Sequence, residues 1–139
     1  MHSPILAPVV ALVAWSMVMW LWMYLTRIPA IQKMQMRLDP QAPRGEQMSQ
    51  LPASVRWKAD NYNHLMEQPT LFYAIALALA LMEQGAGINC TLAWAYVGLR
   101  VVHSVLQATW NKIEARFGLF FISSLVLIAL IFNALRAAF

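Results

Sequence analysis

Apolar residues are concentrated in four long runs, which polar connections separate. The first run, residues 5–26, contains no charged residue in its 22 positions. At a helical rise of about 1.5 Å per residue it spans about 33 Å, enough to cross a hydrocarbon core of about 30 Å. The pattern predicts three further helices over about residues 59–82, 90–108 and 117–136. We therefore expect an all-α fold, an integral membrane bundle of four transmembrane helices that forms one domain over residues 1–139.

The connection between the first two predicted helices, residues 27–58, is polar and rich in proline. Its prolines are Pro29, Pro40, Pro43 and Pro52. They predict a loop in place of a continuous helix, with a short helix at the membrane surface around residues 31–38.

The positions of lysine and arginine predict the orientation of the bundle. Six of the ten Lys and Arg residues lie in residues 27–58, two lie between the third and fourth helices, and none lies in residues 83–89. Short loops rich in Lys and Arg stay on the cytoplasmic side of a membrane. Residues 27–58 are therefore expected to form a cytoplasmic loop of a multi-pass protein, with both termini on the non-cytoplasmic side.

Composition supports a membrane protein and excludes other classes. Hydrophobic residues make up 60% of the chain and charged residues 12%, against about 45–50% and about 25% in soluble domains. These values exclude an ordinary soluble enzyme and a disordered chain, and the single cysteine, Cys90, excludes a disulfide scaffold. Although the net charge is +4, the basic residues flank apolar runs, so the predicted partner is the lipid bilayer and not a nucleic acid.

Ionisable residues inside the predicted helices are the candidates for function, because charge within a membrane is costly. Glu67 and Arg100 each lie about eight residues, or about 12 Å, from the cytoplasmic end of their helices, and His64 and His103 also match in depth. Helical spacing gives two polar faces, formed by Asp60, His64 and Glu67 on the second helix and by Arg100, His103 and Gln107 on the third. These faces are expected to meet inside the bundle.

Two interpretations of this cluster are open. The first is a structural ion pair between Glu67 and Arg100 that stabilises the bundle. The second is a polar pocket open to the cytoplasm, where four basic side chains converge with one acid; these are Arg27, Arg100, His103 and Arg116. Such a surplus of positive charge favours a ligand that carries carboxylates. His64 and Glu67 could also hold a metal ion, but the arginines would repel a cation, so no metal is predicted.

These features resemble the MAPEG family, the membrane-associated proteins of eicosanoid and glutathione metabolism. The similarity covers nearly the whole chain and is carried by HLMEQPTLFY (residues 64–73), by RVVH (residues 100–103) and by Arg116. It implies a homotrimer that binds glutathione, as co-substrate, between neighbouring subunits near the cytoplasmic side. It implies a glutathione transferase or peroxidase that acts on lipophilic electrophiles, and the similarity to bacterial members implies the inner membrane.

The resemblance also implies roles for individual residues. Glu67, Arg100, His103 and Arg116 match glutathione-contacting positions of the family, Arg27 resembles an arginine that ends the first helix, and His64 occupies the place of an asparagine. Arg116 is the predicted catalytic residue, because a cation beside a thiol favours the reactive thiolate. A simpler interpretation of Arg116 is a side chain that extends to the lipid headgroups.

A non-catalytic membrane protein that binds a lipid or scaffolds partners is the alternative. Gln107 stands where the family often has a tyrosine, Phe117 stands where the prostaglandin synthase has a serine, and the arginine of the family's second-helix motif is absent.

Overall fold

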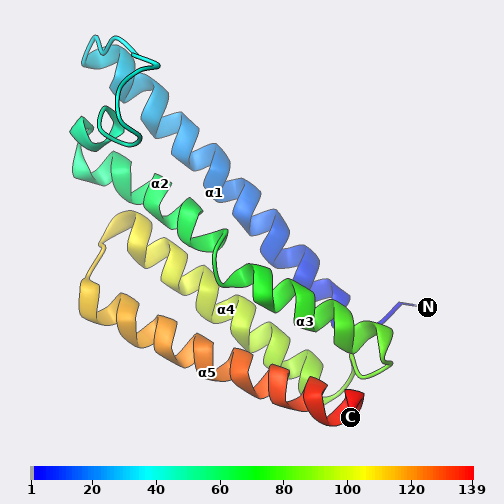
Figure 1. Cartoon of the computed structure of the whole chain (residues 1–139). Coiled ribbons are helices and arrows are strands. Elements are labelled where there is room, and N and C mark those ends of the chain that lie inside the picture. Colours follow the sequence, from blue (N-terminus) through cyan, green and yellow to red (C-terminus); the bar gives the residue numbers. More distant parts are fainter. Residues whose placement is uncertain (1) are drawn as a thin grey trace.

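Helices make up nearly all of the chain in the computed structural model, which describes residues 2–139, and no strand occurs within that range. The elements are α1 (Leu6–Lys33), the short 3-10 helix η1 (Met48–Gln50), α2 (Ala53–Leu65), α3 (Pro69–Leu81), α4 (Ile88–Thr109) and α5 (Ile113–Ala138). Figure 1 shows α2 and α3 following each other as one rod, which lies side by side with the rods formed by α1, α4 and α5. The predicted all-α bundle is confirmed.

Three of the four rods, namely α1, the α2–α3 pair and α5, are long and apolar enough to cross a membrane. Their outer faces carry large apolar side chains that are each at least 50% exposed, among them Val10, Met17, Leu21, Phe121, Leu125 and Ile128. Such a surface suits hydrocarbon and not water. The fourth rod, α4, has 22 residues and is more polar than α1 and α5, and it packs against α1, α2 and α5. A fourth membrane crossing by α4 stays a prediction.

The first helix is longer than its sequence pattern predicted. α1 continues through Pro29 to Lys33, and Gln35 then takes a positive φ of 51° that ends the helix. A proline within a helix removes one hydrogen bond, and here the exposed end of α1 tolerates that loss. The predictions that the helix stops near residue 26 and that a separate helix covers residues 31–38 were therefore wrong.

The second predicted helix also differs, since it begins at Ala53 and is broken in its middle. Pro69 is the first residue of α3, and its ring nitrogen cannot donate the hydrogen bond that would join α3 to α2. Tighter bonds replace the helical ones in the break, from Met66 N to Asn63 O at 3.0 Å and from Glu67 N to His64 O at 3.2 Å. Residues 66–68 therefore leave the helical register, which decides where Glu67 points.

The connection between α3 and α4 packs tightly against the start of α1. Gly85 is buried there, and a Cβ atom at this position would overlap Ser3 Oγ and lie 2.7 Å from Cγ2 of the fully buried Ile5. Gly85→Ala is expected to lower the free energy of unfolding by about 1–3 kcal/mol, because the buried isoleucine must move. The measurement is the melting temperature in detergent. Gly98→Ala is the control, since open space surrounds Gly98 within α4, and it should leave stability unchanged or raise it.

Candidate functional site

Arg100 lies in the centre of the bundle and has no exposed surface. One of its terminal nitrogens, Nη2, is 2.6 Å from Nδ1 of His64 on α2. Within residues 2–139, its other two nitrogens, Nε and Nη1, have no hydrogen-bond partner. A buried cation with unused donors is costly unless an anion or another acceptor joins it. The chain therefore presents a positive charge that can accept a negatively charged group.

Aromatic rings surround the Arg100 guanidinium. The imidazoles of His64 and His103 are stacked, with ring centroids 4.9 Å apart and planes inclined by 22°. Phe120 of α5 meets His64 edge-on at 5.3 Å, and its ring lies 5.9 Å from Cζ of Arg100. Nδ1 of His103 is buried and has no partner in the described chain. The rings hold the guanidinium in place and leave polar atoms available for a ligand.

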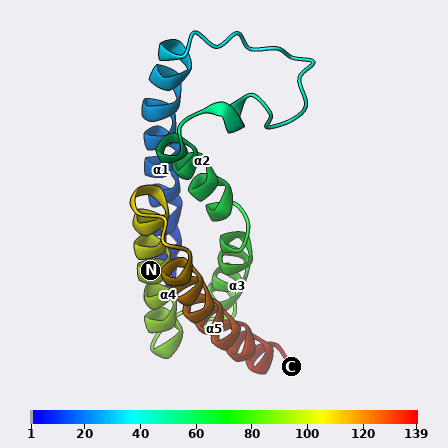
Figure 2. The same ribbon diagram turned by 90° about the vertical axis from the view of Figure 1, so that its left-hand side faces the viewer.

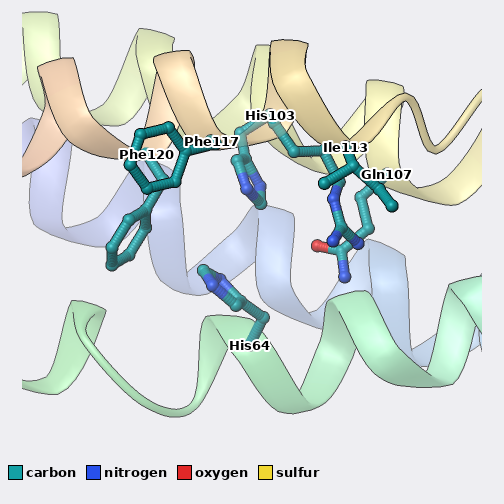
Figure 3. Close-up of a pocket in the computed structure, with 7 residues that line it drawn as sticks. His64, His103, Gln107, Ile113, Phe117 and Phe120 are labelled. Carbon is teal, nitrogen blue, oxygen red and sulfur yellow. The ribbon is translucent and has the colours of Figure 1, made fainter.

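A cavity of about 210 Å³ opens beside these rings, between α2, α4 and α5, and we call it the histidine cavity. It is lined by His64, His103, Gln107, Ile113, Arg116, Phe117 and Phe120. Figure 3 shows His64 extending from α2 towards His103, with Phe120 beside the pair. Because no acidic residue lines it, the cavity favours an anionic ligand.

Arg116 enters this cavity from the first turn of α5. Its Nη1 donates to Oδ1 of Asn111 at 2.7 Å, and Asn111 itself has a positive φ of 54° in the turn between α4 and α5. This bond gives Arg116 a defined position at the cavity wall and does not neutralise its charge. The guanidinium can stabilise a negative charge that forms within the cavity.

The structure brings together some of the predicted site residues and separates others. His64, His103 and Arg116 line the histidine cavity, and Arg100 lies behind it in contact with His64. Glu67 is exposed in the break between α2 and α3. Arg27 lines a different cavity.

The matched depths of Glu67 and Arg100 predicted an ion pair between them. Within the single chain, Arg100 instead forms a hydrogen bond with His64. The prediction assumed one continuous helix, in which Glu67 follows His64 on the same face. Because α2 ends at Leu65, that periodicity does not extend to Glu67.

Several polar contacts at the site were missed by the sequence analysis. Ser104 Oγ donates to Oδ1 of the buried Asn61 at 3.1 Å, which links α4 to α2 one residue after His103. Tyr96 donates to Gln68 Oε1 at 3.1 Å, and Gln68 Nε2 donates to Ser124 Oγ at 2.9 Å. Phe120 could have been predicted as a site residue, because it follows Arg116 by four residues and therefore lies on the same face of α5 as Arg116.

Among residues 2–139, no three side chains of the His, Cys, Asp or Glu type come together as a metal ion would require.

The fold and the site define a helical membrane protein with a basic, aromatic-lined cavity between its helices. The MAPEG family model matches residues 5–136, nearly the whole chain. The chain belongs to the MAPEG family. None of the curated proteins and none of the solved structures compared with the chain matches it.

Proposed function

We propose that the chain binds glutathione and acts as a glutathione transferase, or a peroxidase, on lipophilic electrophiles. Membership of the MAPEG family fits a glutathione-related membrane protein. The observation that carries the proposal is Arg100, which is fully buried beside the histidine cavity with two donors unused. Glutathione carries two carboxylates and one thiol, and a guanidinium binds carboxylates in a fork-like geometry.

The binding roles follow from where the side chains lie. Arg100 and His103 would hold a carboxylate of glutathione, and the vacant Nε and Nη1 donors of Arg100 make this pairing favourable. His64 positions the guanidinium through its 2.6 Å contact. Arg116 would lie near the thiol, because it reaches the cavity from another helix, α5.

The reaction needs a thiolate close to an electrophile that is dissolved in lipid. The glutathione thiol loses its proton to solvent, and the positive charge of Arg116 stabilises the resulting thiolate. For an aryl halide, the thiolate sulfur then forms a bond with the ring carbon, and the carbon–halogen bond breaks to release halide. The exposed apolar Phe117 at the cavity wall gives such a substrate a route from the lipid.

The site of one chain is incomplete, and this supports a homotrimer. The histidine cavity holds about 210 Å³, whereas small-molecule pockets usually hold about 300–1,000 Å³. Phe117 and Ile113 on its wall are each 68% exposed, and Glu67 is also exposed although it lies within a membrane-spanning segment. A neighbouring copy would cover these residues, and Glu67 or Arg27 would then reach the glutathione between two subunits.

Native mass spectrometry in a mild detergent tests the assembly. We expect an assembly of several copies, because charge at Glu67 is costly against lipid and is better covered by protein. The resemblance to the MAPEG family makes the expected number three. A spectrum with monomers alone would contradict the shared site.

The proposal also includes a location and an orientation. We propose that the protein lies in an inner membrane, with residues 34–52 on the cytoplasmic side. The six basic residues of positions 27–58 support this orientation.

A direct test of the function uses glutathione and an aryl halide such as chlorodinitrobenzene. Binding should raise the melting temperature of the purified protein in millimolar glutathione. Turnover should release the glutathione conjugate, which mass spectrometry identifies. If neither occurs, the transferase proposal fails.

The second candidate is a non-catalytic membrane protein that binds a lipid or scaffolds partners. Gln107 and Phe117 both line the histidine cavity, so the family's usual tyrosine and the synthase's serine are missing from its wall. If millimolar glutathione gives neither a melting-temperature shift nor a conjugate, this candidate takes the place of the transferase.

A further inference from the structure

A polar cavity of about 320 Å³ lies between the α3–α4 turn and the last turns of α5. We call it the amide cavity, because three carboxamide side chains line it together with one arginine. Its lining residues are Gln84, Ile88, Asn89, Asn133, Arg136 and Ala137. None of them lines the histidine cavity, and none is assigned to glutathione. The occupation of the amide cavity therefore goes beyond the proposed function.

The length of α5 separates this cavity from the histidine cavity. Arg136 lies about 30 Å along the helix from Arg116, at a rise of about 1.5 Å per residue, and α5 is long and apolar enough to cross a membrane. Figure 2 shows the C-terminal end of α5 at one end of the molecule and the loop between α1 and α2 at the other. Because the proposed orientation puts that loop on the cytoplasmic side, the amide cavity belongs to the non-cytoplasmic surface.

Two hydrogen bonds hold the polar lining in place. Asn133 Nδ2 donates to Oδ1 of Asn89 at 2.8 Å, which joins α5 to α4. Asn89 Nδ2 donates to the main-chain oxygen of Gln84 at 2.8 Å, which fixes the turn after α3. Asn89 itself is buried. The wall of the cavity is therefore defined, and the carboxamide of Gln84 and the side-chain oxygen of Asn133 can still bind a ligand.

Arg136 gives the amide cavity its charge. No carboxylate of residues 2–139 lines the cavity, so the arginine leaves it with a net positive charge. The guanidinium carbon of Arg136 lies 5.9 Å from the ring of Phe132, on the same face of α5 one turn earlier. A guanidinium binds phosphate oxygens through paired N–H donors. The cavity therefore favours a ligand that carries a phosphate group.

The three carboxamides favour a particular group beyond the phosphate. A carboxamide both donates and accepts hydrogen bonds, and a hydroxyl does the same. An ammonium group only donates, and the carboxylate that would balance its charge is missing from the described lining. A headgroup with hydroxyls, such as glycerol phosphate, therefore fits better than an ethanolamine headgroup.

Apolar side chains beside the cavity indicate that the phosphate belongs to a lipid. Ile88, on the cavity wall, is 64% exposed, and Phe132, next to Arg136, is 57% exposed. Acyl chains would cover this apolar surface, whereas a soluble phosphate compound would leave it uncovered.

We propose that the amide cavity binds the glycerol phosphate headgroup of an anionic phospholipid at the non-cytoplasmic surface. Arg136 contacts the phosphate oxygens. Gln84 and Asn133 exchange hydrogen bonds with the glycerol hydroxyls, and the acyl chains lie against Ile88 and Phe132. The bound lipid holds the α3–α4 turn to the end of α5.

Native mass spectrometry of the full-length protein in a neutral detergent tests this binding. The probe is phosphatidylglycerol, and the control ligands are phosphatidylethanolamine and a diacylglycerol with the same acyl chains. We expect one retained phosphatidylglycerol per chain, about fivefold weaker binding of phosphatidylethanolamine, and no retained diacylglycerol. If either control ligand is retained as strongly as phosphatidylglycerol, the proposal is overturned.

Two variants locate the lipid in the cavity. Arg136→Gln should bind phosphatidylglycerol about tenfold more weakly, because it loses a charged donor. Gln84→Ala should bind it about fivefold more weakly, and it keeps the main-chain oxygen that accepts from Asn89. The matched control is Arg37→Gln, which removes the same charge from an exposed position outside the cavity, and it should bind within about twofold of the unchanged protein. Equal losses in Arg37→Gln and Arg136→Gln would overturn the proposal.

A purely structural role of Arg136 predicts a different result. A cation in the last turn of α5 can simply balance the negative end of the helix dipole. Arg136→Gln would then lower the melting temperature of the lipid-free protein and leave the retention of phosphatidylglycerol unchanged, which contradicts the proposal.

Glycerol phosphate, a soluble compound with the same headgroup chemistry, distinguishes the two sources of the phosphate. Retention of phosphatidylglycerol that depends on Arg136 supports the lipid. If glycerol phosphate raises the melting temperature through Arg136 while phosphatidylglycerol is not retained, the lipid source is overturned. Glutathione binding should be unchanged in Arg136→Gln, so failure here is distinguishable from failure of the proposed function.

Discussion

Replacing Arg100 by methionine is expected to weaken glutathione binding about ten- to hundredfold. Hydrogen bonds to a charged group in a dry site contribute about 1.5–3 kcal/mol, and Arg100 offers two unused donors there. Isothermal titration of the purified protein with glutathione measures the change in Kd.

The same variant should still fold, and this makes the experiment decisive. Arg100 is a buried cation whose nearest polar contact is a histidine, so a methionine of similar length removes a costly charge and fills the space. Its melting temperature without glutathione should be at or above that of the unchanged protein. Arg136→Met, at the exposed end of α5, is the control and should bind glutathione normally. If Arg100→Met binds glutathione equally well, Arg100 has no place in the site.

Replacing Arg116 by alanine is expected to affect the rate and not the binding. The Kd for glutathione should stay within a few fold, because the carboxylate contacts are assigned to Arg100 and His103. Conjugation of an aryl halide at pH 7 should slow about ten- to hundredfold, since loss of the cation returns the pKa of the bound thiol towards its ordinary value of about 8.5.

The difference in conjugation rate between the unchanged protein and Arg116→Ala should depend on pH. With Arg116 present, the bound thiol has a lowered pKa, so the rate advantage is complete only at pH values below that lowered pKa. It shrinks as the pH rises from there and is lost above about 8.5, where the thiol is ionised in both proteins. The rates of the two proteins should therefore converge as the pH rises past that value. Lys112→Ala removes an exposed charge from the same turn and should change neither quantity. Equal rates for Arg116→Ala and the unchanged protein at every pH would indicate a residue that only contacts lipid headgroups.

Composition and hydrophobic periodicity were enough to predict a membrane protein, because both are sums over residues and do not depend on how the helices pack. Residues 5–26 are apolar throughout, and the structure places a helix there whose outer face remains apolar. The pairing of His64 with the helix that carries Arg100 and His103 was also predictable. Equal depth on two helices joined by a short turn leaves few other arrangements.

The break at residues 66–68 could have been foreseen only in part. A proline at position 69 indicates a helix boundary, but many membrane helices continue through proline, as α1 does at Pro29. Which of the two prolines breaks its helix depends on packing around it. Pro69 is fully buried, whereas Pro29 is exposed.

Sequence patterns alone identify this chain as a helical membrane protein of the MAPEG family. They do not identify the side chain that contacts Arg100, because a change of register over three residues moves Glu67 to the surface and leaves His64 as the partner. The tertiary structure also separated Arg27 from Arg116 into two cavities. Local patterns specify the face of a helix, whereas contacts between helices depend on where each helix starts, bends and ends.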